Sequence, residues 1–242
     1  MSSLTEGLKR YHRSTRSAAY GYLISLPLLF LYEFLIYVSE PDPSHYVRIG
    51  ADVWVRSLLS LIGSNTTALT FALALIIGIA IFFVDRKKHI HLKVTYFLGI
   101  IGESIIYALI LGIIISRFTT VLVNAIPPPT QQMSIIQRFA LSLGAGLYEE
   151  LFFRVVLVAV FMWIFKLLSF KGWAQKFAAI VSAAMIFSLA HFTGNMGDPF
   201  TIYAFVFRFL FGLALNVIYI TRGFGAAAWT HALYDTLLIF LI

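Results

Sequence analysis

The stretch IQRFALSLGAGLYEELFFRVVLVAVFMWIF, residues 136–165, decides what kind of protein this is. It is long and apolar enough to cross a bilayer, which takes about 20 residues at a rise of 1.5 Å each. Yet it carries Glu149, Glu150 and Arg154 well inside the apolar run. A charged side chain at the bilayer centre costs roughly 2.5 to 3.5 kcal/mol on insertion scales. These groups are therefore expected to face the interior of a helical bundle rather than lipid.

The rest of the chain repeats this apolar character. Hydrophobic residues make up 60% of the 242 positions and charged residues 12%, and the mean hydropathy is +0.88. We therefore predict one integral membrane domain over residues 1–242, an all-α polytopic transmembrane bundle of about seven to eight spans with a motif-bearing core at about 136–242. The predicted spans are 18–38, 66–84, 94–124, 136–165, 177–194, 200–220 and 223–242.

The segment 51–62 is a special case, because Asp52 and Arg56 lie among its apolar residues. It is typical of an interfacial or re-entrant helix, with an eighth short span as the alternative. Glu33 and Glu103 also lie inside predicted spans; we expect Glu33 near an interface and Glu103 facing the cavity, with pairing to an arginine as the alternative for either. Arginines in other spans, at positions 117 and 208, are candidate partners.

The net charge of +7 is concentrated in short segments beside the spans. Basic residues cluster before the first span, near residues 86–93 and near residues 166–176, whereas acidic residues gather in the loops of the other side. This alternation predicts a cytoplasmic N-terminus and contact with membrane lipids. No basic stretch remains outside the membrane to bind nucleic acid. The absence of cysteine excludes thiol nucleophiles and thiolate metal sites.

Helical spacing separates the two adjacent glutamates. At about 100° per residue, Glu150 and Arg154 lie one turn apart on one face, whereas Glu149 points about 100° away from Glu150. We expect Glu150 and Arg154 to form a structural ion pair and Glu149 to be the free carboxylate. Gly144 and Gly146 leave a smooth flank suited to close helix packing or to the approach of a substrate.

Two later spans carry histidines. His191 ends the fifth predicted span, and His231 precedes Asp235 by four residues, on one helix face. A carboxylate and two histidines can activate water: Glu149 would take the proton, His191 would orient the water, and His231 would stabilise the developing oxyanion. The same Glu149, His191 and His231 could instead supply three ligands of a catalytic zinc. The zincin motif His-Glu-x-x-His is absent, and we favour a site without metal or other cofactor.

The set Glu149-Glu150-x-x-x-Arg154, Phe187-x-x-x-His191 and His231-x-x-x-Asp235 resembles the CAAX protease and bacteriocin-processing (Abi) family of intramembrane endopeptidases. The resemblance covers roughly residues 140–242. It implies a helical membrane protease with Glu149 as general base, His191 at the nucleophilic water and His231 with its i+4 partner at the oxyanion. It also implies a membrane-associated peptide or lipidated protein as substrate and, for a prokaryotic member, the cytoplasmic membrane.

One position departs from the family pattern. Its last motif often ends in Asn, whereas this chain has Asp235. An amide can donate a hydrogen bond to an oxyanion, but an ionised carboxylate cannot. Asp235 is therefore expected to be protonated, or to orient and charge His231.

Two other functions use the same residues. A proton-coupled transporter would employ buried glutamate and histidine side chains as a relay. A non-catalytic membrane scaffold or immunity protein would keep the fold without the chemistry, although the glutamates and both histidines are intact here. The sequence does not indicate an oligomeric state.

Overall fold

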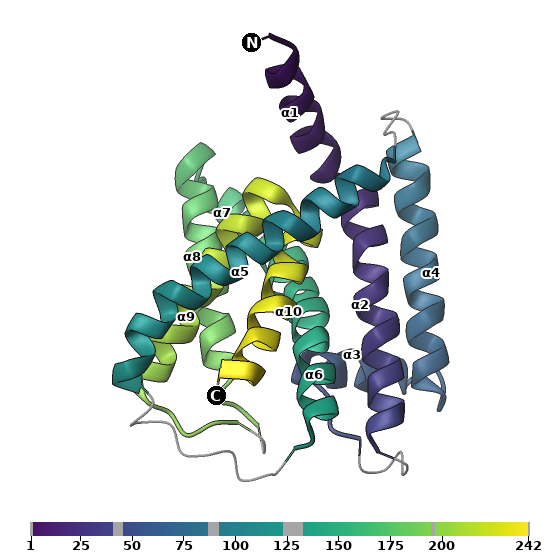
Figure 1. Ribbon diagram of the computed structural model, residues 1–242, viewed down its shortest axis with the longest axis vertical. Coiled ribbons are helices and arrows are strands. Elements are labelled where there is room, and N and C mark those ends of the chain that lie inside the picture. Colours follow the sequence, from purple (N-terminus) through teal and green to yellow (C-terminus); the bar gives the residue numbers. More distant parts are fainter. Residues whose placement is uncertain (1, 41–45, 87–91, 123–132, 195–196, 242) are drawn as a thin grey trace.

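The computed structural model describes residues 2–40, 46–86, 92–122, 133–194 and 197–241, and all regular structure in these ranges is helical. Figure 1 shows the helices gathered into a bundle from which α1 projects at one end. Their bounds are α1 Ser2–Thr15, α2 Ala18–Ser39, α3 Gly50–Leu59, α4 Thr66–Asp85, α5 Val94–Leu122, α6 Ile135–Gly144, η3 Ala145–Glu149, η4 Leu151–Leu157, α7 Val158–Leu167, α8 Gly172–Ala190, α9 Ile202–Arg222 and α10 Phe224–Leu241.

The predicted all-α polytopic bundle is confirmed. Five helices of the described residues are by themselves long and apolar enough to cross a membrane, namely α2, α4, α5 up to Ile114, α8 and α9. The predicted span 136–165 corresponds to one helical passage in which α6, η3, η4 and α7 follow one another, and 223–242 corresponds to α10. The chain is therefore an integral membrane protein. Residues 123, 124 and 242 of the predicted spans lie outside the described part.

Helix α3 accounts for the segment 51–62. Its ten residues rise about 15 Å, half of a hydrocarbon core of about 30 Å. An eighth span at this position is therefore too short to cross, and the prediction of a short interfacial or re-entrant helix fits better. Figure 1 shows α3 at the end of the bundle opposite to α1.

Side-chain caps explain where several spans begin. Ser17 accepts a hydrogen bond from the Tyr20 amide at the start of α2, and Asn65 accepts one from Ala68 at the start of α4. Ser134 forms a reciprocal capping box with Gln137 before α6. Each cap satisfies an amide that the first helical turn leaves without a partner. The apolar runs therefore start as helices at defined residues.

Helix α10 lies at the centre of the bundle and touches α2, α5, α6, α9 and η3. Trp229 donates a hydrogen bond to the Ile24 carbonyl of α2 at 2.7 Å, and Ser104 of α5 donates to the Ala226 carbonyl. Figure 1 shows α5 crossing α10 obliquely. In contrast, α4 lies at the periphery, since only 6% of its apolar window is buried. Helix α10, which carries His231, and the passage that carries the two glutamates therefore lie in the interior of the bundle.

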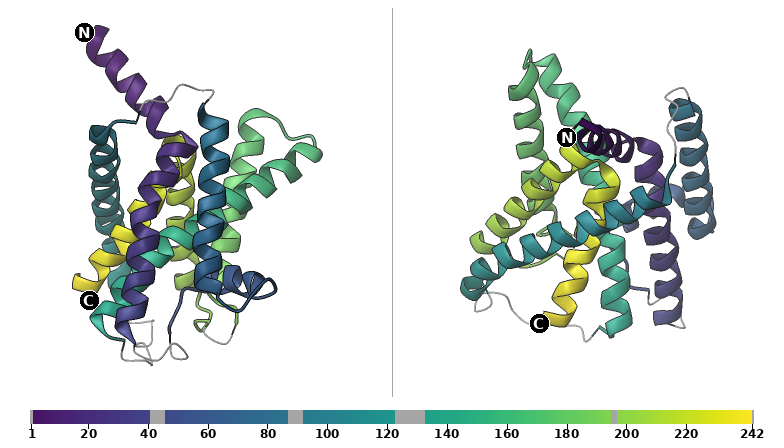
Figure 2. Two further views of the ribbon diagram at one scale, coloured as in Figure 1. Left: turned by 90° about the vertical axis from the view of Figure 1, so that its right-hand side faces the viewer. Right: turned by 45° about the horizontal axis from the view of Figure 1, so that its top comes forward.

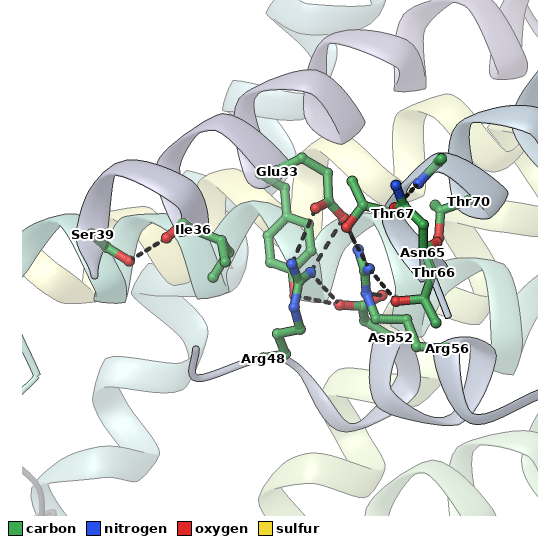
Figure 3. Close-up of polar contacts among 12 residues, drawn as sticks. Glu33, Ile36, Ser39, Arg48, Asp52, Arg56, Asn65, Thr66, Thr67 and Thr70 are labelled. Carbon is green, nitrogen blue, oxygen red and sulfur yellow. Dashed lines mark hydrogen bonds and ion pairs between the residues drawn. The ribbon is translucent and has the colours of Figure 1, made fainter. Parts of the chain in front are cut away.

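A buried ion network ties α3 to α2 (Figure 3). Glu33 of α2 pairs with Arg48 and Arg56, and Asp52 accepts from both arginines at 2.9 and 2.8 Å. Tyr32 also donates to Asp52, at 2.8 Å. Burial alone would lower the pKa of Arg48, but the hydrogen bond to Glu33 and the charges of Glu33 and Asp52 raise it above its ordinary value. The network therefore holds α3 against the bundle with its charges compensated.

The expected partners of the other span charges are corrected by these contacts. Glu33 pairs with arginines of the α3 segment rather than with one from another span. Glu103 of α5 binds Arg222 at the end of α9, with Nε and Oε2 2.7 Å apart. Arg208 pairs with Asp198. Loop and helix-end residues supply these partners: Arg48 precedes α3, Arg222 ends α9, and Asp198 precedes α9.

Candidate active site

The helical passage that carries the two glutamates is π-helical where they lie. Residues Ala145–Glu149 and Leu151–Leu157 form π-helical segments η3 and η4. This wide geometry is rare and occurs frequently at functional sites. Gly146 lets this segment approach α10 closely: a Cβ at this position would lie 2.4 Å from the Ala228 carbonyl oxygen. The predicted close packing of the glycine flank is confirmed.

Glu150 and Arg154 form the expected pair. Both side chains are fully buried, and Oε2 of Glu150 lies 2.9 Å from Nε of Arg154 in an ion pair whose angles fall outside hydrogen-bond geometry. The guanidinium carbon of Arg154 lies over the Phe187 ring, 4.4 Å from its centroid. The aromatic face and the carboxylate together compensate a buried cation.

Glu149 is the freer carboxylate, as expected from the helical spacing. Its side chain is 13% exposed, and its Oε2 lies 3.9 Å from Nε2 of His191. His191 follows the last residue of α8, and its Nδ1 lies 2.9 Å from the Phe187 carbonyl oxygen. Because a carbonyl can only accept, Nδ1 carries the hydrogen, and in the neutral ring Nε2 is left as an acceptor facing Glu149.

His231 of α10 lies between two carboxylates. Its Nδ1 lies 2.7 Å from Oε1 of Glu150, and its Nε2 lies 3.4 Å from Oδ2 of Asp235. His231 is almost fully buried, whereas the Asp235 side chain is 28% exposed. The expected proximity of His231 and Asp235 is confirmed. The contact with Glu150 was not predicted, and it gives Glu150 a second role beyond pairing with Arg154.

Phe187 joins the parts of this site. Its ring packs edge to face against His191 at 4.8 Å between centroids and against His231 at 6.3 Å. It is 2% exposed and also contacts Arg154. The sequence pattern identified Phe187 only as the first residue of the Phe187-x-x-x-His191 motif, and its packing against both histidines was not predicted. Its position four residues before His191, on the same helix face, was the available signal.

The structure thus brings the predicted residues together from three helical passages. Glu149 faces His191, and Glu150 links His231 with Arg154. The alternative zinc ligands Glu149, His191 and His231 do not form a ready metal site: among the described residues, no group of three or more His, Asp or Glu side chains is arranged to hold a metal ion. The metal-free mechanism stays a prediction.

Comparison with known families agrees with the motifs. The model of the family described as type II CAAX prenyl endopeptidase Rce1-like matches residues 131–237. This segment holds every residue of the site, so the predicted relationship to the CAAX protease family is confirmed there at the level of the family. No curated protein and no solved structure matches the chain.

Proposed function

We propose that this protein is a glutamate-type intramembrane endopeptidase that cleaves membrane-associated peptides or lipidated proteins. The observation that carries the proposal is the gap between Glu149 and His191. Their facing atoms, Oε2 and Nε2, are 3.9 Å apart, too far for a direct hydrogen bond and suited to a shared water. The CAAX endopeptidase family of residues 131–237 supports the same chemistry.

The two side chains divide the work on that water. Glu149 accepts one proton as general base, and Nε2 of His191 accepts a hydrogen bond from the other hydrogen, which orients the oxygen toward the substrate carbonyl carbon. When the carbon–nitrogen bond breaks, Glu149 returns the proton to the leaving amine. The Phe187 carbonyl supports this assignment, because it holds the hydrogen of His191 on Nδ1.

His231 is proposed to stabilise the tetrahedral oxyanion. A donor at Nε2 requires the doubly protonated ring, because Nδ1 already donates to Glu150. The two carboxylates at its nitrogens favour this form, and the long 3.4 Å contact with Asp235 leaves room for Nε2–H to turn toward an oxyanion. In this mechanism Asp235 orients and charges His231 and does not itself bind the oxyanion. No metal or cofactor takes part.

The setting proposed for this reaction is the cytoplasmic membrane of a prokaryote, with the N-terminus in the cytoplasm. The basic residues of α1 and of the α7–α8 turn support this orientation by the positive-inside rule. Both segments lie toward the same end of the bundle (Figure 1).

Comparison of membrane peptide termini tests the proposal. Cells lacking the protein are complemented with wild type, Glu149→Gln or, as a matched control, Glu6→Gln, which changes an exposed glutamate of α1. New N- and C-terminal peptides are expected with wild type and Glu6→Gln, and none with Glu149→Gln at equal expression. Identical profiles with a phenotype rescued by both Glu149 forms would contradict the protease. Proton-driven flux in vesicles that survives Glu149→Asp would favour a transporter.

A further inference from the structure

One cavity of the protein lies away from the catalytic candidates. It has a volume of about 780 Å³ and is bordered by α2, α4, the η3–η4–α7 passage and the junction of α9 with α10. In the left view of Figure 2, α4 lies in front, with α2 to one side of it and α7 and α8 to the other. Glu149, His191, His231 and Asp235 do not line it. The cavity is therefore separate from the proposed active site.

The cavity is an apolar groove with a cationic mouth. Its walls are made largely of Leu, Ile, Val, Ala and Met side chains. Arg16 and Lys176 are the charged side chains that border it, and among the described residues no Asp or Glu does. Both are exposed, and Arg16 reaches across to the Ile220 carbonyl at 2.8 Å. A ligand that fits this groove is apolar along its length and negative at one end.

The length of the groove matches one leaflet of a bilayer. Its lining runs along α2 from Ser17 at the cationic mouth to Leu29 at the closed end. Twelve residues of helix rise about 18 Å, close to half of a hydrocarbon core of about 30 Å. The closed end is well buried, with Leu29, Leu147 and Tyr148 each less than a tenth exposed. Along α2 the groove thus runs inward from the α1 end over about the length of one leaflet, and its far end reaches Val55 of α3.

We propose that this groove binds one anionic phospholipid, with its phosphate between Arg16 and Lys176 and an acyl chain along α2. Basic side chains at a groove between membrane helices attract anionic headgroups. Leu147, Tyr148 and Leu151 line the groove and flank Glu149 and Glu150 in the sequence. The bound chain therefore supports the π-helical passage from the side of α2 and α4.

Photocrosslinking tests the site directly. The full-length protein is reconstituted in phosphatidylcholine vesicles containing a small fraction of phosphatidylglycerol with a photoreactive group at the end of one acyl chain, and the labelled peptides are mapped. Labelling is expected at Leu147, Leu151 and Val155, and unlabelled phosphatidylglycerol, but not added phosphatidylcholine, should compete with it. Uniform labelling of lipid-facing helices would overturn the proposal.

Two double variants distinguish binding at a specific site from non-specific attraction of anionic lipid to the basic surface of the protein. Arg16→Gln with Lys176→Gln removes the cationic mouth, and labelling in the groove is expected to fall about tenfold or more, since each basic group near a membrane surface strengthens anion binding several-fold. Lys166→Gln with Lys171→Gln removes two exposed charges of the α7–α8 region and should leave labelling unchanged. An equal loss in both pairs would overturn the site. Competition by a lipidated peptide but not by phosphatidylglycerol would show that the groove takes a substrate chain instead.

Discussion

Glu150 and His231 are 81 residues apart in the sequence, yet Oε1 of the glutamate lies 2.7 Å from Nδ1 of the histidine. The other oxygen of Glu150 lies 2.9 Å from Arg154. Both oxygens of one fully buried carboxylate are thus committed to cations or donors, whereas the neighbouring Glu149 has only a 3.9 Å contact with His191. The two adjacent glutamates therefore differ in their contacts: both oxygens of Glu150 are engaged, and Glu149 is the carboxylate that we propose to react.

The first prediction distinguishes the two glutamates by their effect on stability. Glu150→Gln leaves Arg154 as a buried, uncompensated charge, which should cost about 3 to 5 kcal/mol and lower the thermal unfolding temperature in detergent markedly. Glu149→Gln, the matched amide at the next position, breaks no close ion pair and should unfold near the wild-type temperature while abolishing cleavage. Equal destabilisation by both changes would contradict this division.

A second prediction concerns His191. His191→Asn removes the acceptor that faces Glu149, and the cleavage rate should fall about 10²- to 10⁴-fold, the usual contribution of a positioned acid–base group. The unfolding temperature should change little, because His191 lies at a helix end and its side chain is 27% exposed. Cleavage of a substrate identified by the peptide profiles provides the measurement, with His12→Asn on exposed α1 as control. A wild-type rate would remove His191 from the mechanism.

A third prediction uses the glycine flank. Gly146→Ala places a methyl group 2.4 Å from the Ala228 carbonyl oxygen, so η3 must move away from α10, and both stability and cleavage should fall. The control is Gly102→Ala in α5, where the new Cβ meets nothing within 4 Å. A helical glycine replaced by alanine in open space should stabilise by about 0.5 to 1 kcal/mol. Thermal unfolding of the two variants should therefore shift in opposite directions.

The fourth prediction addresses the network at α3. Arg56→Met removes the group that binds Glu33 and Asp52 together with Thr66 and Thr67. Loss of one partner of a buried ion pair should destabilise by about 3 kcal/mol or more, and α3 should detach from α2.

Because the chain has no cysteine, a single Val55→Cys in α3 reports this detachment through maleimide labelling. Labelling is expected to become faster with Arg56→Met and to stay unchanged with Arg138→Met, which alters an exposed arginine of α6. Unchanged labelling with Arg56→Met would show that apolar packing alone holds α3 in place.

Local patterns account for the parts of the molecule that could be predicted. The apolar runs gave the helices to within a few residues at most ends, because a span of about 20 apolar residues has few alternatives in a membrane. The Glu150–Arg154 and His231–Asp235 contacts follow from four-residue spacing on a helix.

Contacts between residues far apart in the sequence could not be predicted from local patterns. No spacing rule links Glu150 to His231, and hydropathy does not indicate that the loop after α2 folds back so that Arg48 and Arg56 reach Glu33. The π-helical geometry could not be predicted either, because the sequence pattern was interpreted with the regular α-helical rotation of 100° per residue. Helix α1 was missed because its residues are polar and basic, and only the folded chain shows that they are helical.

The π-helical passage has a consequence for how this geometry can be lost. A π-turn contains more residues than an α-turn, so removal of one residue from η3 can restore a regular α-helix without breaking the span. The helix beyond the deletion would keep nearly the same orientation, because the shorter α-turn covers about the same rotation as the wide turn that it replaces. Such a chain would keep its hydropathy profile, its topology and every motif residue, and would lose only the wide turn that lies against α10. In this protein the motif and the π-helical turn are separable by a single codon.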